Sequence, residues 1–79
     1  MNRIGPSQRA VAAYVEANPG CPKLRPAEHV GPHGSRKYGY AAVDRAIRAG
    51  LIVDRGIKTY QLYLTAKGAA LLGIDDFAG

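Results

Sequence analysis

The sequence GPHGSRKYGYAAVDRAIRAGLIVDRG, residues 31–56, changes character twice. Loop-forming residues give way to an alanine-rich segment with a helical repeat, and this segment ends at Gly50. An aliphatic triplet and a charged turn then follow. Glycine is typical of the position just after a helix, where the backbone often adopts a left-handed conformation. The stretch therefore predicts a helix that leads directly into a β-hairpin.

The predicted helix has an apolar side and a basic side. At about 100° per residue, Tyr40 and Ile47 fall within about 60° of Val43, and the basic residues fall around the opposite side. Gly39 costs up to about 1 kcal/mol inside a helix. Two starts of the helix are therefore considered. It begins near Ser35 and tolerates the glycine, or it begins near Gly39 after an approach loop.

The segment PSQRAVAAYVEANPG, residues 6–20, predicts a first helix of about three turns. Val11, Tyr14 and Val15 follow the i, i+3, i+4 spacing of one apolar stripe. Pro6 suits the first helical turn, where its missing N–H is not needed. The Asn-Pro-Gly sequence at 18–20 ends the helix.

Two shorter helices are expected, one between the two longer helices and one after the hairpin. The sequence RPAEHV has space for one, with Pro26 at its first position and Leu24 and Val30 as its apolar anchors. The sequence AKGAALLG, residues 66–73, predicts the other, with Thr65 as its N-cap.

The hairpin is predicted from LIVD, the turn RGIKT and the strand YQLYLT. Asp54 and Gly56 supply residues that are common in turns. The second strand shows the alternation of a half-buried strand, with one side formed by three residues: Tyr60, Leu62 and Leu64.

The predicted order is helix, short helix, helix, hairpin, helix. A chain of 79 residues has room for one domain with a simple core. We expect a single domain over residues 1–79, with its core at about 6–73 and a loosely held acidic tail at 74–79. The fold class is mainly α with a small β-hairpin. The order matches a winged helix-turn-helix: a three-helix core, a two- or three-stranded wing and a short C-terminal helix.

Two segments, RAIRAGLI (45–52) and YLTAKGAALL (63–72), resemble small bacterial or phage winged-helix proteins, including the DNA-binding part of MarR-type regulators. In that family an arginine-rich recognition helix ends at Gly-Leu-Ile, and the second wing strand runs into Leu-Thr-x-x-Gly. The resemblance implies a winged-helix fold and a DNA-facing surface. Those regulators place the wing arginine earlier, whereas Val53 and Asp54 precede Arg55 here. They also have flanking helices for dimerisation and ligand sensing, so ligand-controlled derepression is not implied.

Positive charge is concentrated in the same region. Between residues 36 and 58 there are six basic and two acidic residues, which places +4 of the net charge of +5 in this segment. A basic surface favours a polyanionic partner. A solvated helix face is the alternative interpretation, but such a face normally mixes Glu with Lys. Asp44 is expected to pair with Arg48 at i, i+4.

The candidate site follows from these charges. A helix in the major groove offers donors to base edges, and wing residues contact the phosphate backbone or the minor groove. The candidate DNA-binding residues are Ser35, Arg36, Lys37, Tyr38, Arg45, Arg48, Arg55 and Lys58.

The predicted function is sequence-specific binding of double-stranded DNA, as a small transcriptional regulator or a phage regulatory or recombination factor. A single module covers only about 600–1,000 Å², so a second copy or a regulatory protein is an expected additional partner. The alternative is a winged-helix interaction module that docks on a host or regulatory protein through the same basic helix.

Other classes are not supported by the sequence. Cys21, His29 and His33 lack a fourth ligand for tetrahedral zinc, so no metal is expected. The sequence GPHGS is neither a phosphate-binding loop nor a dinucleotide fingerprint, so no cofactor and no enzyme activity are predicted. One cysteine is typical of a reducing compartment. No apolar run approaches the roughly 18 residues of a membrane span. These features predict a cytoplasmic protein without a membrane partner.

Overall fold

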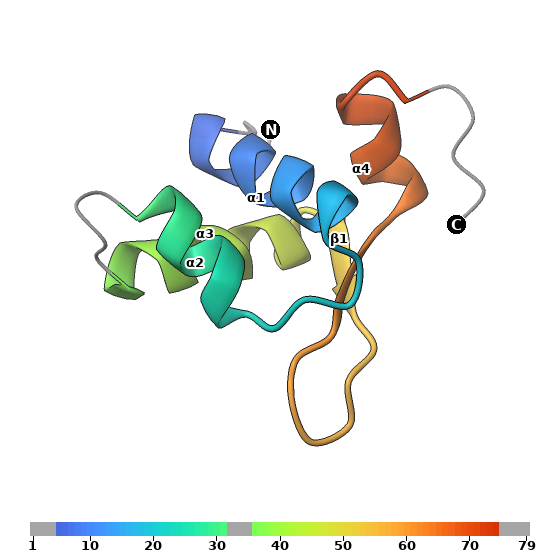
Figure 1. Ribbon diagram of the computed structural model, residues 1–79. Coiled ribbons are helices and arrows are strands. Elements are labelled where there is room, and N and C mark those ends of the chain that lie inside the picture. Colours follow the sequence, from blue (N-terminus) through green and yellow to red (C-terminus); the bar gives the residue numbers. More distant parts are fainter. Residues whose placement is uncertain (1–4, 32–35, 75–79) are drawn as a thin grey trace.

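A computed structural model describes residues 5–31 and 36–74 of the chain (Figure 1). The elements in order are α1 (Pro6–Ala17), α2 (Leu24–Val30), α3 (Arg36–Arg48), β1 (Ile52–Asp54), β2 (Leu62–Leu64) and α4 (Ala66–Leu71). Helices α1, α2 and α3 pack together, and the loop between β1 and β2 extends away from them (Figure 1). The predicted mainly helical fold with an antiparallel hairpin is confirmed. The predicted tail beyond Ile74 lies outside the described residues.

Helix α1 has the expected bounds and the expected buried side. Pro6 occupies its first position, and the backbone N–H of Asn18 donates to the carbonyls of Tyr14 and Val15 at its end. Val11 and Val15 are fully buried, together with Ala12 between them. The apolar stripe therefore packs against the other helices as its spacing predicts.

Helix α2 begins two residues before the predicted start at Pro26. Its fully buried residues are Pro26 and Ala27, whereas the predicted anchors Leu24 and Val30 are only half-buried. Val30 nevertheless packs against the buried core, as predicted, whereas Leu24 is not among the residues that pack there. Small or compact side chains take the central positions because α2 approaches α3 closely at this point.

Gly39 makes the close approach of α2 and α3 possible. It lies inside α3, which begins at Arg36, and it is buried. A Cβ atom at this position would overlap the backbone carbonyl oxygen of Ala27. Glycine thus permits backbone-to-backbone contact between α2 and α3, which offsets its low helix propensity. Of the two starts considered for this helix, the earlier one is close to the start observed.

The buried side of α3 is formed by small residues. Ala42, Val43 and Ala46 are at most 4% exposed, whereas Tyr40 and Ile47 are half-buried at the edge of the core. The apolar side is therefore rotated away from Tyr40 and Ile47, relative to the prediction centred on Val43.

Strands β1 and β2 pair in an antiparallel register that places Ile52 opposite Leu64 and Asp54 opposite Leu62. Leu62 and Leu64 are buried, as the alternation predicts, but Tyr60 is 40% exposed because it lies in the loop before β2. Cys21 forms an isolated antiparallel bridge with Leu62. This bridge attaches the segment between α1 and α2 to the edge of the hairpin.

Thr65 joins the end of α3, the hairpin and α4. Its hydroxyl donates to the carbonyl of Gly50, and its oxygen accepts the N–H of Gly68 at 3.0 Å as the predicted N-cap. Its own N–H donates to the carbonyl of Leu51 at 3.0 Å. Gly50 has a φ of +79°, and a Cβ at Gly68 would overlap the carbonyl oxygen of Leu51. The Gly-Leu-Ile and Leu-Thr-x-x-Gly motifs are therefore the two halves of one backbone junction.

Within residues 5–31 and 36–74, no helix combines the length and apolar character that crossing a bilayer requires.

Candidate nucleic-acid interface

Helix α3 exposes a row of cationic side chains. Lys37, Ala41, Arg45 and Arg48 are spaced at i, i+4, i+8 and i+11, which keeps them on one side of the helix. The three basic members of this row are exposed, and Tyr38 is 66% exposed beside them. This side lies opposite the buried alanines of α3. The helix thus presents long donors outward and small residues inward.

The side chains of two predicted site residues lie outside the described part of the structure. Ser35 lies outside the described residues. Arg36 begins α3, but its side chain is also outside the described part of the structure.

Asp44 does not pair with Arg48, so the i, i+4 prediction was wrong. Its carboxylate instead accepts a hydrogen bond of 2.7 Å from the ammonium of Lys23, which lies just before α2. Burial favours this partner because the Lys23 side chain is only 17% exposed and reaches Asp44 across the packed helices. Among the residues the structure describes, the ion pairs are this one and Arg25–Glu28 at 3.8 Å. The cationic row of α3 is therefore not neutralised within this part of the chain.

Asp54, the second acidic residue of the basic segment, forms hydrogen bonds with the backbone of the hairpin loop. The Asp54 carboxylate accepts the N–H of Gly56 at 2.9 Å and the N–H of Gln61 at 3.0 Å. The hydrogen bond from Gln61, followed by that from Gly56, lowers the pKa of Asp54 because both stabilise the carboxylate. The N–H of Arg55 also donates to the carbonyl of Gln61 at 2.9 Å. These bonds close the loop at residues 55–61, which we call the wing loop.

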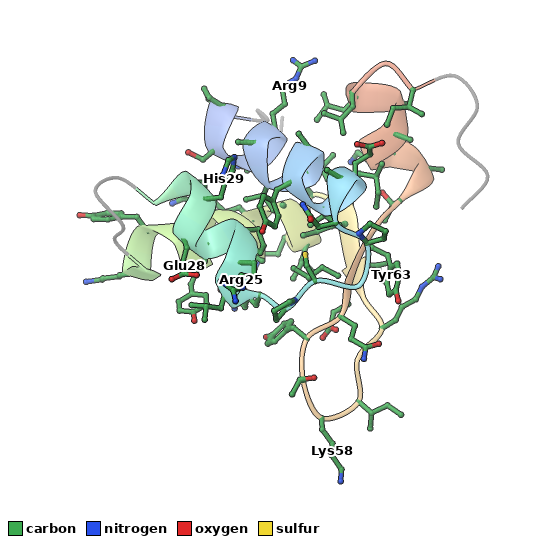
Figure 2. All side chains as sticks on the ribbon, viewed as in Figure 1. Arg9, Arg25, Glu28, His29, Lys58 and Tyr63 are labelled. Carbon is green, nitrogen blue, oxygen red and sulfur yellow. The ribbon has the colours of Figure 1, made fainter. Side chains whose placement is uncertain are left out.

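The basic residues of the wing loop separate into two positions. Lys58 extends from the end of the loop farthest from the helices (Figure 2). Its neighbour Ile57 is fully exposed. Arg55 lies at the base of the loop, with its guanidinium 5.4 Å from the ring centroid of Tyr63. Tyr63 is on the flank of the hairpin away from α2 in Figure 2. These two candidate DNA-binding residues therefore lie at different places on the loop, Lys58 at its tip and Arg55 at its base.

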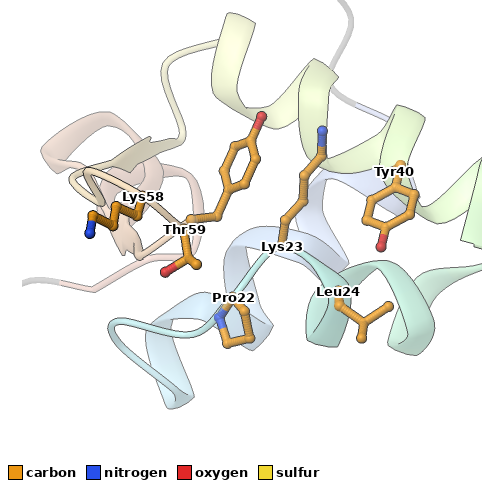
Figure 3. Close-up of a pocket in the computed structure, with 7 residues that line it drawn as sticks. Pro22, Lys23, Leu24, Tyr40, Lys58 and Thr59 are labelled. Atoms are coloured by element: carbon orange, nitrogen blue, oxygen red, sulfur yellow. The ribbon is translucent and has the colours of Figure 1, made fainter.

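A hollow of about 600 Å³ lies between the start of α2, α3 and the wing loop (Figure 3). Lys23 extends into the space between Tyr40 and the loop residues Lys58 and Thr59 (Figure 3). Its ammonium is 5.3 Å from the ring centroid of Tyr40 and 4.9 Å from that of Tyr60. The remaining residues that line the hollow are Pro22 and Leu24. Sequence reasoning missed Lys23 because its partners are distant in the chain and no local pattern points to them.

The residues weighed as metal ligands have packing contacts. His29 lies with its ring centroid 5.1 Å from that of Tyr14. Cys21 is buried, and burial raises the pKa of its thiol. In the described segments, no three His, Cys, Asp or Glu side chains come together as a metal site would require. His33 lies outside the described residues.

Comparisons with protein-family models, with curated proteins and with solved structures found no match to this chain.

Proposed function

We propose that this chain is a winged-helix protein that binds double-stranded DNA, with α3 in the major groove and the wing loop along the adjacent backbone. The observation that carries the proposal is that both acidic residues of the segment 36–58 already have partners within the protein. Asp44 is paired with Lys23, and Asp54 is engaged by the loop backbone. The basic residues on the outer side of α3 therefore face solvent with no carboxylate bound to them in the described structure.

The dimensions of α3 suit this role. Lys37 and Arg48 are separated by eleven positions, which corresponds to about 16 Å along a helix axis. B-DNA advances about 3.4 Å per base pair, so this row spans roughly five base pairs. Arginine can donate two hydrogen bonds to a guanine edge, and lysine can neutralise a phosphate. Arg45 and Arg48 are the residues that we assign to base or backbone contacts at the C-terminal half of the helix.

The wing loop adds a contact outside the helix. Lys58 extends from the tip of the loop, away from the helices (Figure 2), and we assign it to a phosphate that α3 does not contact. Arg55 would contact DNA only along the flank of the hairpin because it is held over Tyr63. One such module covers too little surface for strong sequence specificity by itself. A regulator of this kind would bind a repeated site as two copies.

The test is a titration of labelled duplexes from the region around the chain's own gene at about 50 and 200 mM salt. The wild-type protein should lose affinity steeply as salt rises. Arg45→Ala/Arg48→Ala should weaken binding and reduce the slope of log K against log[salt] by about two, because two cationic contacts are removed. Arg9→Ala/Lys67→Ala removes the same charge from α1 and α4 and should change the slope far less. Arg9 lies on the side away from the wing loop (Figure 2).

Two outcomes would count against the proposal. Equal losses in the two double variants would show that net charge alone, and not the α3 surface, attracts DNA. Unchanged duplex binding by Arg45→Ala/Arg48→Ala would remove α3 from the interface. An acidic protein surface would then be the better partner for the basic helix.

A further inference from the structure

Lys23 connects three parts of the fold through one ammonium group. It precedes α2, its hydrogen bond goes to Asp44 on α3, and its ammonium lies near the ring of Tyr60 in the wing loop. The ring of Tyr40 on α3 lies on another side of it. The Lys23 side chain is 17% exposed, so this arrangement is largely shielded from solvent. Charged contacts of this kind are stronger than equivalent contacts on an open surface.

The backbone hydrogen bonds that attach the hairpin to the α1–α2 segment lie at its base, where Leu62 pairs with Cys21, and not in the wing loop itself. The hydrogen bonds that close the loop are internal to the hairpin: the Asp54 carboxylate accepts from the N–H groups of Gly56 and Gln61, and the N–H of Arg55 donates to the carbonyl of Gln61. They fix its shape but not its angle to the helices. The strands below it are three residues long, and the hollow of about 600 Å³ separates the loop from α2 and α3. The Tyr60 ring brings the loop to Lys23 across this hollow.

The protonation state of Lys23 supports a permanent contact. Burial lowers its pKa, but the hydrogen bond and the attraction to Asp44, followed by the contribution of Tyr60, outweigh burial, and the pKa is raised. The side chain therefore stays charged throughout the physiological pH range. A neutral amine would lose both the ion pair and the attraction to the two rings.

We infer that Lys23 is a positioning residue that holds the wing loop at a fixed angle to α3. Its consequence for DNA rests on the proposed function, because α3 and Lys58 must then contact one duplex at a set spacing. Lys23 also pairs with Asp44, whose side chain is 49% exposed on α3. The alternative role is that Lys23 only neutralises that carboxylate. The two roles give different results in a double variant.

The experiment compares Lys23→Met, Asp44→Asn and the double variant. Methionine keeps the apolar stem of lysine and removes the charge. Backbone order parameters from NMR report the wing loop in the free protein, with values near 0.85 for rigid and below about 0.6 for flexible segments. In both variants that lack Lys23, the amides of residues 56–61 should move towards the flexible range. Asp44→Asn alone should leave them rigid, because the contact of Lys23 with the rings remains.

Duplex binding separates positioning from neutralisation. If Lys23 positions the loop, the double variant stays weaker than wild type and its salt slope is lower by about one, because Lys58 no longer reaches its phosphate reliably. Recovery of wild-type affinity in the double variant, or rigid loop amides in Lys23→Met, would overturn the inference. Arg25→Met is the matched control, since it also removes a cation paired with a carboxylate near the start of α2. It should change neither the order parameters nor the slope.

Failure of the inference and failure of the proposed function are distinguishable. The order parameters are measured without DNA, so they test Lys23 even if the wild-type protein binds no duplex. If Lys23→Met does not fold, Tyr60→Leu removes the other side of the contact at a position that is 40% exposed. The same loop amides should then become flexible, and rigid amides in that variant would refute the inference.

Discussion

Replacing Gly39 with alanine should destabilise the protein, although helix propensity predicts the opposite. In an exposed helix, alanine is about 1 kcal/mol more favourable than glycine. In α3 the new methyl group would overlap the carbonyl oxygen of Ala27 and would lie 2.7 Å from its Cα atom. Carbon atoms in packed interiors are normally about 3.5–4.0 Å apart. Helices α2 and α3 would therefore have to separate by about 1 Å.

The size of the destabilisation depends on the overlap being with a backbone atom of Ala27. A backbone carbonyl cannot move away by changing rotamer, so the whole of α2 must shift. Overpacking of this kind costs about 1–3 kcal/mol, and the propensity gain offsets part of it. Because the overlap is with backbone, a cost at the upper end of this range, about 2–3 kcal/mol, is expected, which leaves a net loss of about 1–2 kcal/mol. For a domain of this size, each 1 kcal/mol corresponds to roughly 4–8 °C in Tm.

Thermal unfolding followed by circular dichroism measures this change, with Ala41→Gly as the control. Ala41 is on the outer side of the same helix, so its substitution measures the propensity term alone and should cost about 1 kcal/mol. If propensity decides, the two variants shift Tm in opposite directions. If the close approach of the helices decides, both lower it. A Gly39→Ala protein as stable as wild type would refute the packing argument.

Three further predictions concern the junction, the loop and the core. Thr65→Val removes both hydroxyl hydrogen bonds and should cost about 1–2 kcal/mol in urea unfolding, whereas Thr65→Ser should recover most of it. The lowered pKa of Asp54 means that its stabilisation of the wing loop is complete above about pH 4 and is lost as the pH falls through the lowered pKa. The amide shifts of Gly56 and Gln61 should follow this titration, and Asp54→Ala should abolish it. Cys21 is buried with a raised thiol pKa, so a disulfide reagent at about pH 8 should react with it only after denaturant is added. A rapid reaction of the folded protein would contradict its burial.

Features with a local cause could be predicted from the sequence. Helix α1 follows from its apolar spacing between a proline and an Asn-Pro-Gly stop. The N-cap at Thr65 and the left-handed Gly50 follow from the chemistry of single residues. In the hairpin, the alternation of Leu62 and Leu64 was sufficient to identify the buried side. In each case the determining atoms lie within a few residues of the feature.

Features that depend on contacts between distant segments could not be predicted in this way. Gly39 was read as a cost to the helix because its benefit comes from Ala27 on another helix. Asp44 was paired with its neighbour on the same helix, but Lys23 is 21 residues away and better shielded. The position of Arg55 was likewise decided by Tyr63 across the hairpin. A single sequence carries no signal for such pairs.

Within the motifs that suggested a family, the residues that form the fold differ from the residues that suggest a function. Gly50, Leu51, Thr65 and Gly68 form a junction of backbone and hydroxyl contacts, so their identities are explained by the fold alone. Any protein that joins a helix, a hairpin and a second helix in this way would need similar residues, whether or not it binds DNA. The cationic row on α3 has no such structural explanation, because its exposed side chains contribute little to packing. The case for DNA binding therefore depends on Arg45 and Arg48 rather than on the junction residues of the same motifs.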